Sequence, residues 1–280
     1  MRPATLGILG IGAIGGAVAR RAKQAGVPLV LGWSPEPAER VAAVREGVVD
    51  DAPTHAAELA GRCDVVVLAG APVANLRWLD TLGARLARRA LITDTGVAKR
   101  AIVARAAALG LGARFAGSRP AVEPATPGLA GARADLLEGA AVYVTPVEGG
   151  DAAAREIVDF WESVCGAHAV LIDAERHDAL AADAAQLAPL VAAAVATALA
   201  GRLPPGTPPG RAVRELTGSA RDAGTPFLEG VWQNRDHARD ALRGVADAAG
   251  LLADALAAGD PGALAAALAA ASRWRSGLGP

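Results

Sequence analysis

A glycine-rich turn near the start of the chain has the residue types and the spacing of a dinucleotide-binding site. Gly10, Gly12 and Gly15 follow an apolar run and precede a segment rich in alanine and valine. In this pattern the first glycine makes the tight turn, the second lets the backbone approach a pyrophosphate, and the third lets helix and strand pack closely. The amide groups at the start of the helix, with those of Ala13 and Ile14 among them, then bind the anion. The sequence therefore predicts that the chain binds NAD or NADP.

The choice between the two cofactors depends on the end of the second predicted strand. NAD-binding folds usually carry an acidic residue there, about twenty residues after the glycines, and it binds the ribose 2′-hydroxyl. This chain has Ser34 at that place, which can donate a hydrogen bond to a 2′-phosphate. Arg40 is either a second phosphate contact or, as we favour, a solvated helix residue. Since no carboxylate is expected at this position, the sequence favours NADP over NAD.

The composition restricts the class of protein. With 52% hydrophobic residues and 28 Lys and Arg against 29 Asp and Glu, the chain is expected to be globular and to lack the basic surface of a nucleic-acid-binding protein. Cys63 and Cys165 lie far apart with no metal-ligand spacing, so we expect buried, reduced thiols and no metal site.

Two further features concern the cellular location. The first predicted strand begins within the first ten residues, so no signal peptide is expected before it. The most apolar segment, 187–200, is shorter than the roughly 20 residues that a membrane span needs. We therefore expect a cytoplasmic protein that has no membrane partner.

The pattern of apolar segments predicts an α/β fold. Short strand-like runs alternate with helical patterns up to residue 173, which is typical of a Rossmann-like, doubly wound parallel sheet. The expected strands after the first are 27–32, 64–68, 90–94, 113–115, 141–145 and 169–172. Beyond residue 173 only helices are predicted, at about 174–200, 211–221, 227–258 and 261–274. We therefore expect a dinucleotide-binding domain at 1–173 and an all-helical domain at 174–280.

Several motifs follow the glycine-rich turn in a fixed order. They are Asp94-Thr-Gly-Val-Ala-Lys99, Phe115-Ala-Gly-Ser-Arg-Pro120, a Gly-Leu-Ala-Gly stretch from Gly128, Val142-Tyr-Val-Thr-Pro146, His177-Asp178 and Gln233-Asn-Arg235. Their order and spacing resemble the prephenate/arogenate dehydrogenase family over essentially the whole chain. The resemblance implies a Rossmann domain followed by a helical dimerisation domain, and hence a homodimer. It also implies a small carboxylic acid as substrate: a cyclohexadienol that gives a hydride to NAD(P)⁺ while its ring loses CO₂ and becomes aromatic.

The first motifs depart from the family pattern at residues that would carry the chemistry. The family's Asp-x-x-Ser-x-Lys keeps Asp94, expected near the cofactor, and Lys99, a candidate catalytic residue, but Val97 replaces the serine. The family's His-Pro reads Arg119-Pro120, and a glycine three residues later is Glu123. Since arginine stays protonated, Arg119 cannot accept a hydroxyl proton as histidine does. It is instead a strong partner for a carboxylate or phosphate.

The helical part also departs from the family pattern. Ala185-Gln-Leu-Ala188 stands where the family has Ser-His-Leu-Pro. Thr217-Gly218 replaces a Thr/Ser-Arg pair, which removes a bidentate anchor for a substrate carboxylate. These changes, with the glycine-rich turn intact, indicate an altered substrate pocket.

Two further catalytic candidates each have an alternative interpretation. Glu123 is either a general base or the salt-bridge partner of Arg119, and we favour the salt bridge because a carboxylate beside arginine is weakly basic. His177 is either catalytic or, with Asp178, part of a cap at the start of a helix.

Three functions are compatible with these residues. The chain is a prephenate or arogenate dehydrogenase, a dehydrogenase or reductase of another small acid anchored by Arg119, or an inactive dimer that binds the cofactor. The missing histidine argues against the first.

Overall fold

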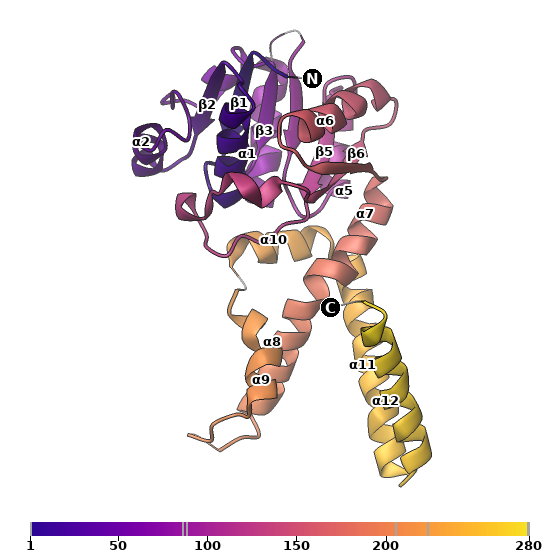
Figure 1. Cartoon of the computed structure of the whole chain (residues 1–280). Helices are drawn as coiled ribbons and strands as arrows, with labels where there is room; N and C mark the ends of the chain where they lie inside the picture. Colours follow the sequence, from indigo (N-terminus) through magenta and orange to yellow (C-terminus); the bar gives the residue numbers. More distant parts are fainter. Residues whose placement is uncertain (1, 86, 88, 205, 223, 279–280) are drawn as a thin grey trace. The chain divides into compact units, whose positions relative to one another are not determined.

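The structure of the protein, a computed structural model, describes residues 2–85, 87, 89–204, 206–222 and 224–278 (Figure 1). The chain forms two compact units. The first comprises Met1–Ala181 and Gly224–Asn234, and the second comprises Ala182–Ala223 and Arg235–Pro280. This division lies eight residues after the boundary expected at 173, and it places the later segment 224–234 with the first unit.

A four-stranded parallel sheet forms the centre of the first unit. Its strands are β1 (Thr5–Leu9), β2 (Leu29–Trp33), β3 (Val65–Leu68) and β4 (Leu91–Asp94), in the order β2-β1-β3-β4. The last residues of neighbouring strands pair with one another, as in Leu9 with Trp33 and Leu68 with Asp94. The glycine-rich turn, the end of β2 and Asp94 therefore meet at the same edge of the sheet.

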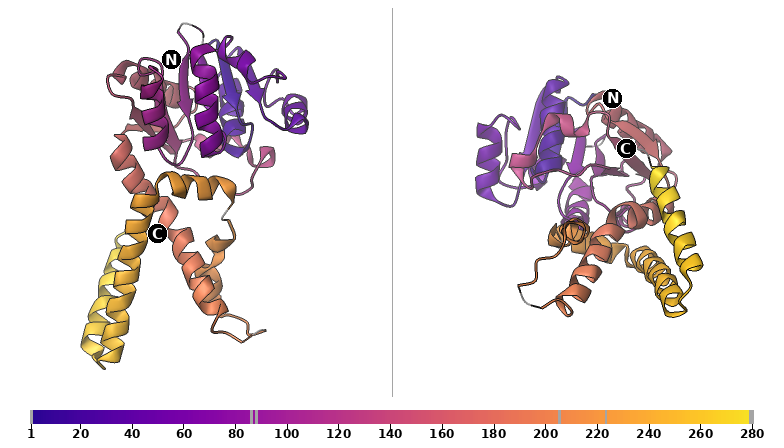
Figure 2. Two further views of the ribbon diagram at one scale, coloured as in Figure 1. Left: turned by 180° about the vertical axis from the view of Figure 1, so that it is seen from behind. Right: turned by 60° about the horizontal axis from the view of Figure 1, so that its bottom comes forward.

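Helices cover both faces of this sheet because each strand is apolar on both sides. Val65 and Val67 of β3 belong to one buried cluster, whereas Val66 and Leu68 belong to the other. One face packs against α1 (Ala13–Gln24) and α6 (Asp151–Ser163), which lie in front in Figure 1. The other packs against α3 (Ala57–Ala60), α4 (Pro72–Leu82) and α5 (Arg100–Ala108), and Figure 2 shows this side. The short α2 (Pro37–Arg45) follows β2. The predicted Rossmann-like, doubly wound fold is confirmed.

A second sheet of three strands completes the α/β part, and it differs from the prediction. The strands are β5 (Ala116–Pro120), β6 (Ala141–Pro146) and β7 (His168–Leu171). Only Phe115 of the expected strand 113–115 pairs with the first sheet, through a parallel bridge to Ile92. β6 is antiparallel to β5 and parallel to β7, so the expectation that these strands extend the parallel sheet was wrong.

The physical reason lies in the connection between β5 and β6. It contains two short 3₁₀ turns, Leu129–Gly131 and Ala134–Leu137, instead of the crossover helix that a parallel pair normally requires. The chain therefore returns along β5 in the opposite direction.

The second unit is all helical. It comprises a π-helical turn (Ala182–Gln186), α8 (Leu187–Ala200), α9 (Arg211–Leu216), a 3₁₀ turn (Gly218–Asp222), α11 (Arg235–Ala257) and α12 (Pro261–Ser276). Asp260 begins α12, because its side chain accepts a hydrogen bond from the amide of Ala263 and Pro261 occupies the first helical position. α7 (Ala174–Ala181) and α10 (Thr225–Gln233) belong to the first unit.

Among the described residues, one helical stretch is long and apolar enough to cross a membrane by length and composition alone. It is Ala174–Ala200, 27 residues long, and 22% of its apolar window is buried. It exceeds the segment 187–200 considered above because α7 and the π-helical turn continue into α8. Core helices of soluble proteins pass the same test, so this feature is weak evidence for a membrane span.

Candidate active site

A cavity of about 320 Å³ lies at the carboxyl edge of the first sheet. Its walls come from the glycine-rich turn, the segment after β3, the turn between β4 and α5, and two prolines. The lining residues are Gly12, Ala13, Ile14, Ala69, Gly70, Ala71, Pro72, Thr95, Gly96, Val97, Pro124 and Pro226. Ligands of open α/β sheets bind at this edge.

The three glycines of the turn have different roles in the structure. Gly10 has a φ of +97°, and a Cβ there would lie 2.6 Å from the carbonyl oxygen of Ala69. A Cβ on Gly15 would lie 2.0 Å from the carbonyl oxygen of Gly10. A Cβ on Gly12 would meet nothing within 4 Å, since this residue lines the cavity. The fold therefore requires Gly10 and Gly15, whereas Gly12 keeps the cavity open.

The start of α1 is suited to an anion. Gly12 occupies the N-cap position and provides no side chain to bind the first amide groups of the helix. These amides have no partner within the helix and carry the positive end of its dipole. Ala13 and Ile14, both predicted to contact the cofactor, lie at this helix start and line the cavity.

Asp94 holds the turn that forms one wall of the cavity. Its Oδ1 accepts a hydrogen bond from the amide of Ser118 at 3.0 Å. Its Oδ2 accepts bonds from the amide of Gly96 at 2.8 Å and from Nζ of Lys99 at 2.5 Å. The carboxylate is buried, so the structure places Asp94 behind the cavity wall.

Lys99 is completely buried and joins this turn to β5. Besides Asp94, its Nζ donates to the carbonyl oxygen of Ser118 at 2.8 Å. Burial lowers the pKa of Lys99 from its usual value, and the neighbouring carboxylate of Asp94 opposes this change. Ser118 also bonds Thr93 and Trp161 through its hydroxyl, so Lys99 is anchored in a connected polar network.

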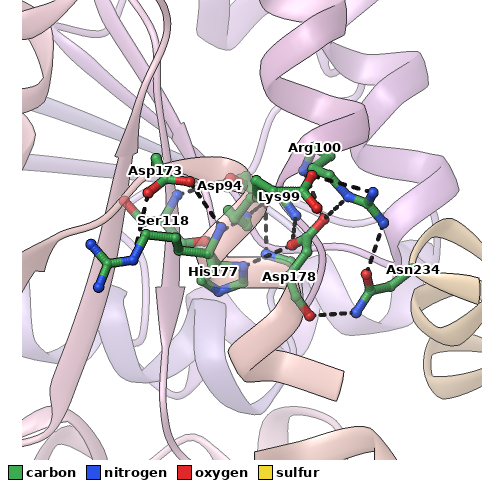
Figure 3. Close-up of polar contacts among 11 residues, drawn as sticks. Asp94, Lys99, Arg100, Ser118, Asp173, His177, Asp178 and Asn234 are labelled. Carbon is green, nitrogen blue, oxygen red and sulfur yellow. Dashed lines mark hydrogen bonds and ion pairs between the residues drawn. The ribbon is translucent and has the colours of Figure 1, made fainter. Parts of the chain in front are cut away.

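Asp178 of α7 binds the beginning of α5 (Figure 3). Its Oδ1 accepts a hydrogen bond from the amide of Lys99 at 2.7 Å, and its Oδ2 accepts from the amide of Arg100 at 3.0 Å. Asn234 donates to the carbonyl oxygen of Asp178 at 2.7 Å and accepts from Arg100 at 3.1 Å. Burial alone would raise the pKa of Asp178, but the hydrogen bonds from His177 and these amides outweigh burial, and the pKa is lowered.

The alternative of a helix cap formed by His177 and Asp178 is wrong for their own helix. Both residues lie inside α7, and the side chain of Asp173 instead accepts a hydrogen bond from the amide of Arg176 at its start. Asp178 instead caps α5, although it lies 79 residues after Lys99 in the sequence. Sequence spacing does not reveal such a tertiary cap.

His177 is buried beside Asp178 and has one unused ring nitrogen. Its Nδ1 lies 2.8 Å from Oδ1 of the ionised Asp178, so Nδ1 carries the proton and donates it. Its Nε2 is buried and has no hydrogen-bond partner among the described residues. Burial lowers the pKa of His177, Asp178 opposes the change, and the charges of Lys99 and Arg119 add to it. The imidazole is therefore neutral at pH 7, with a free acceptor on Nε2.

Arg119 lies on β5 opposite Tyr143 of β6, whose ring makes an edge contact with His177. Its side chain is half-buried, and burial lowers its pKa, while the charges of Tyr143, Asp178 and Glu123 oppose this. The favoured salt bridge between Arg119 and Glu123 was wrong: no ion pair joins them in the part of the chain that the structure describes. Glu123 instead lies exposed in the loop after β5.

The end of β2 also differs from the prediction. Ser34 is buried, and its hydroxyl donates to the carboxylate of Glu39. Arg40, expected to be solvated, is half-buried and donates to the carbonyl oxygen of Ser34 at 2.6 Å. A carboxylate therefore lies at this turn, where the sequence interpretation placed none.

Val97 lines the cavity and packs against α10. A Cβ on Gly230 would lie 2.3 Å from Cγ1 of Val97, so the helix approaches this turn closely only because residue 230 is glycine. The amide of Val73 in α4 donates to Glu229 at 2.9 Å and fixes the same helix. Thr217 and Gly218, by contrast, lie in the second unit.

Sequence reasoning missed several residues that build this site. Ser118, Asn234 and Glu39 belong to quoted motifs or neighbouring helices but received no role. Asn75 is buried, and its Oδ1 accepts a hydrogen bond from the amide of Gly70 beside the cavity. Its position three residues after Pro72, in the first turn of α4, was the feature of the sequence that could have indicated this role.

No group of three or more His, Cys, Asp or Glu side chains that could hold a metal occurs among the residues that the structure describes. Cys63 and Cys165 are buried and unbonded to each other. Burial raises the pKa of Cys63 to about 12 and that of Cys165 further, so both thiols remain protonated.

A parallel sheet with a glycine-rich turn and a cavity at its carboxyl edge defines a dinucleotide-binding domain of the dehydrogenase type. The sequence profile of the prephenate dehydrogenase nucleotide-binding domain matches residues 18–171, more than half of the chain. The chain therefore belongs to the prephenate dehydrogenase family, whose members are NAD-dependent dehydrogenases.

Two solved structures have a similar fold. Prephenate dehydrogenase from A. aeolicus, in complex with hydroxyphenyl propionate and NAD⁺, is 22% identical, with a TM-score of 0.87 and 98% of each chain covered. Arogenate dehydrogenase from Synechocystis is 23% identical, with a TM-score of 0.82 and coverage of 98% of this chain and 99% of that one. At these identities the likeness establishes the fold. No curated protein sequence matches the chain.

The neutral state of His177 predicts how stability depends on pH. The unfolded chain takes up a proton at this residue near pH 6.5, whereas the folded protein does so only at lower pH. The free energy of unfolding should therefore fall as the pH is lowered from 7.5 to 5.5, with a contribution from His177 of at most about 1.4 kcal/mol per pH unit. Urea unfolding of wild type and His177→Asn at pH 7.5, 6.5 and 5.5 measures it.

The variant should lose this part of the slope, whereas His55→Asn, which changes an exposed histidine, should keep it. Equal slopes for wild type and His177→Asn would contradict the neutral, desolvated state of the imidazole.

Proposed function

We propose that this protein is an NAD(P)-dependent oxidoreductase that moves a hydride between the nicotinamide and a small carboxylic acid held by Arg119. The observation that carries the proposal is the environment of Arg119. Its guanidinium is half-buried and has no hydrogen bond or ion pair among the described residues. A partly desolvated charge without a counterion is costly, and a ligand carboxylate would offset that cost with a bidentate contact.

In this proposal the substrate differs from prephenate and arogenate. Arg119 stands where the family has the histidine that pairs with the ring hydroxyl. Val97, which packs on α10, stands where the family has a serine. Gly218 stands where the family has an arginine that would bind a substrate carboxylate. Three changed side chains alter both proton transfer and anchoring, whereas the glycine-rich turn is intact.

We assign proton transfer to His177. Lys99 is held by Asp94 and Ser118, and Glu123 lies in an exposed loop, so neither has a free acceptor in the buried cluster. Nε2 of His177 is a free acceptor in this cluster, because Asp178 holds the proton of the ring on Nδ1. A dinucleotide held at the glycine-rich turn would supply the hydride acceptor for the carbon that bears the substrate hydroxyl. Nε2 of His177 would take up the hydroxyl proton as that carbon is oxidised to a carbonyl.

A screen of turnover tests this function. NAD⁺ and NADP⁺ are offered with prephenate, arogenate and small hydroxy acids, and NADH and NADPH with keto acids, while the absorbance of the reduced nicotinamide is followed. We expect turnover of an acid other than prephenate. Arg119→Ala should raise its KM by roughly 10- to 100-fold, the loss expected for a charge-assisted contact. Arg133→Ala, which removes an exposed arginine bound to Asp135, should not.

Arg119→His combined with Val97→Ser should raise any residual prephenate activity. Oxidation of prephenate at an ordinary enzymatic rate by wild type, unaffected by Arg119→Ala, would contradict the proposed substrate change. Cofactor binding with no turnover of any acid would favour an inactive cofactor-binding dimer.

The proposal includes a homodimer formed through the second unit. Leu251 and Leu256 of α11 and Leu268 and Trp274 of α12 are each more than half exposed. Burial of these side chains against a second copy would stabilise the assembly at about 25 cal/mol per Å² of apolar surface.

Analytical ultracentrifugation at micromolar concentration should give twice the chain mass of 28.0 kDa. Leu251→Asp with Leu256→Asp should shift the protein to monomers, whereas Val41→Asp, at an exposed position of α2, should not. A monomer mass for wild type would contradict the homodimer.

The proposal also places the protein in the cytoplasm, with small molecules and no nucleic acid or membrane as partners. The apolar helical stretch 174–200 begins with α7, whose His177 and Asp178 take part in the buried polar network of the first unit. A membrane span would have to give up these contacts. The near balance of 28 basic and 29 acidic residues gives no basic surface for nucleic acid.

A further inference from the structure

The turn after β2 lies directly beside the glycine-rich turn. The amide of Gly10 donates to the carbonyl oxygen of Trp33, the last residue of β2, at 2.7 Å. Ser34 follows Trp33, so its side chain occupies the place where NAD-binding folds carry an acidic residue for the adenosine ribose. The side chains that contact Ser34 therefore lie near the position of the ribose 2′ group in a bound dinucleotide.

The hydroxyl of Ser34 is not available to a phosphate. It donates its only proton to the carboxylate of Glu39, in the first turn of α2, and it accepts a hydrogen bond from the amide of Glu36 at 3.3 Å. Ser34 is buried, so these contacts are shielded from water. The hydrogen bond from Ser34 thereby holds the Glu39 carboxylate at the end of β2, next to the position where other folds carry an acidic residue on the strand itself.

Arg40 does not neutralise this carboxylate. Its Nη1 donates to the carbonyl oxygens of Ser34 at 2.6 Å and Pro35 at 3.4 Å, and no ion pair joins it to Glu39 within the described residues. The carboxylate of Glu39, docked on Ser34, thus has no cationic partner among the described residues. Its charge is therefore unfavourable for a 2′-phosphate, which brings about two further negative charges.

We infer that Glu39, docked on Ser34, determines the cofactor preference of this protein and selects NAD over NADP. Its carboxylate accepts a hydrogen bond from the ribose 2′-hydroxyl of NAD and repels the 2′-phosphate of NADP. This reverses the preference that the sequence indicates, because the acidic residue comes from the next helix instead of the strand end. The inference rests on the proposed function, since it assumes that a dinucleotide occupies the cavity.

Titrations with NAD⁺ and NADP⁺, followed by protein fluorescence, test the inference. The proteins are wild type, Glu39→Gln, Ser34→Ala and the control Glu36→Gln, whose parent carboxylate makes no contact with Ser34. Thermal melts establish that each variant is folded. Wild type should bind NAD⁺ at least tenfold more tightly than NADP⁺. Glu39→Gln should lower that ratio about tenfold by tightening NADP⁺ binding, and Ser34→Ala should lower it less, because Glu39 keeps its charge but loses its anchor.

Glu36→Gln should leave the ratio within twofold of wild type. An equal or tighter affinity of wild type for NADP⁺ would overturn the inference, as would an unchanged ratio in folded Glu39→Gln. If wild type binds neither nucleotide at millimolar concentration, the proposed function itself fails. That result is distinguishable from binding of both nucleotides with the wrong preference.

Discussion

The buried carboxylate of Asp178 is the contact on which the architecture of the first unit depends. It accepts hydrogen bonds from the amides of Lys99 and Arg100, from Nε of Arg100 and from the ring of His177, four donors from two elements that lie far apart in the sequence. A buried charge is tolerated only when its hydrogen bonds are satisfied, and breaking such a set is expected to cost about 3–5 kcal/mol. Asp178 therefore fixes where α5 begins.

The position of α5 in turn determines the wall of the cavity. Lys99 at its start reaches Asp94 and Ser118, and Asp94 holds the amide of Gly96, a lining residue. Each of these contacts satisfies a group that burial would otherwise leave unpaired. The network supports the cavity from behind.

The sequence predicts the parts of this arrangement that depend on local chemistry. The glycine-rich turn, the buried strands and the helix start at Pro261 follow from backbone conformation and apolar periodicity. The reversal of β6, the cap that Asp178 provides and the docking of Glu39 on Ser34 all depend on tertiary approach. Residue spacing carries no signal for such contacts. For the same reason, the salt bridge expected from the four-residue spacing of Arg119 and Glu123 does not form in the structure.

Binding of NAD⁺ to wild type and to Gly12→Val tests whether the cofactor occupies the cavity at the glycine-rich turn, because only Gly12 among the three glycines faces open space. A valine side chain there would fill the cavity without disturbing its neighbours. Gly61→Val is the matched control, since a Cβ at that position meets only one atom, at 4.0 Å, and Gly61 lies outside the cavity lining. We predict that Gly12→Val keeps the melting temperature of wild type and weakens NAD⁺ binding at least 100-fold, while Gly61→Val binds normally. Unchanged affinity in folded Gly12→Val would contradict a cofactor site in this cavity.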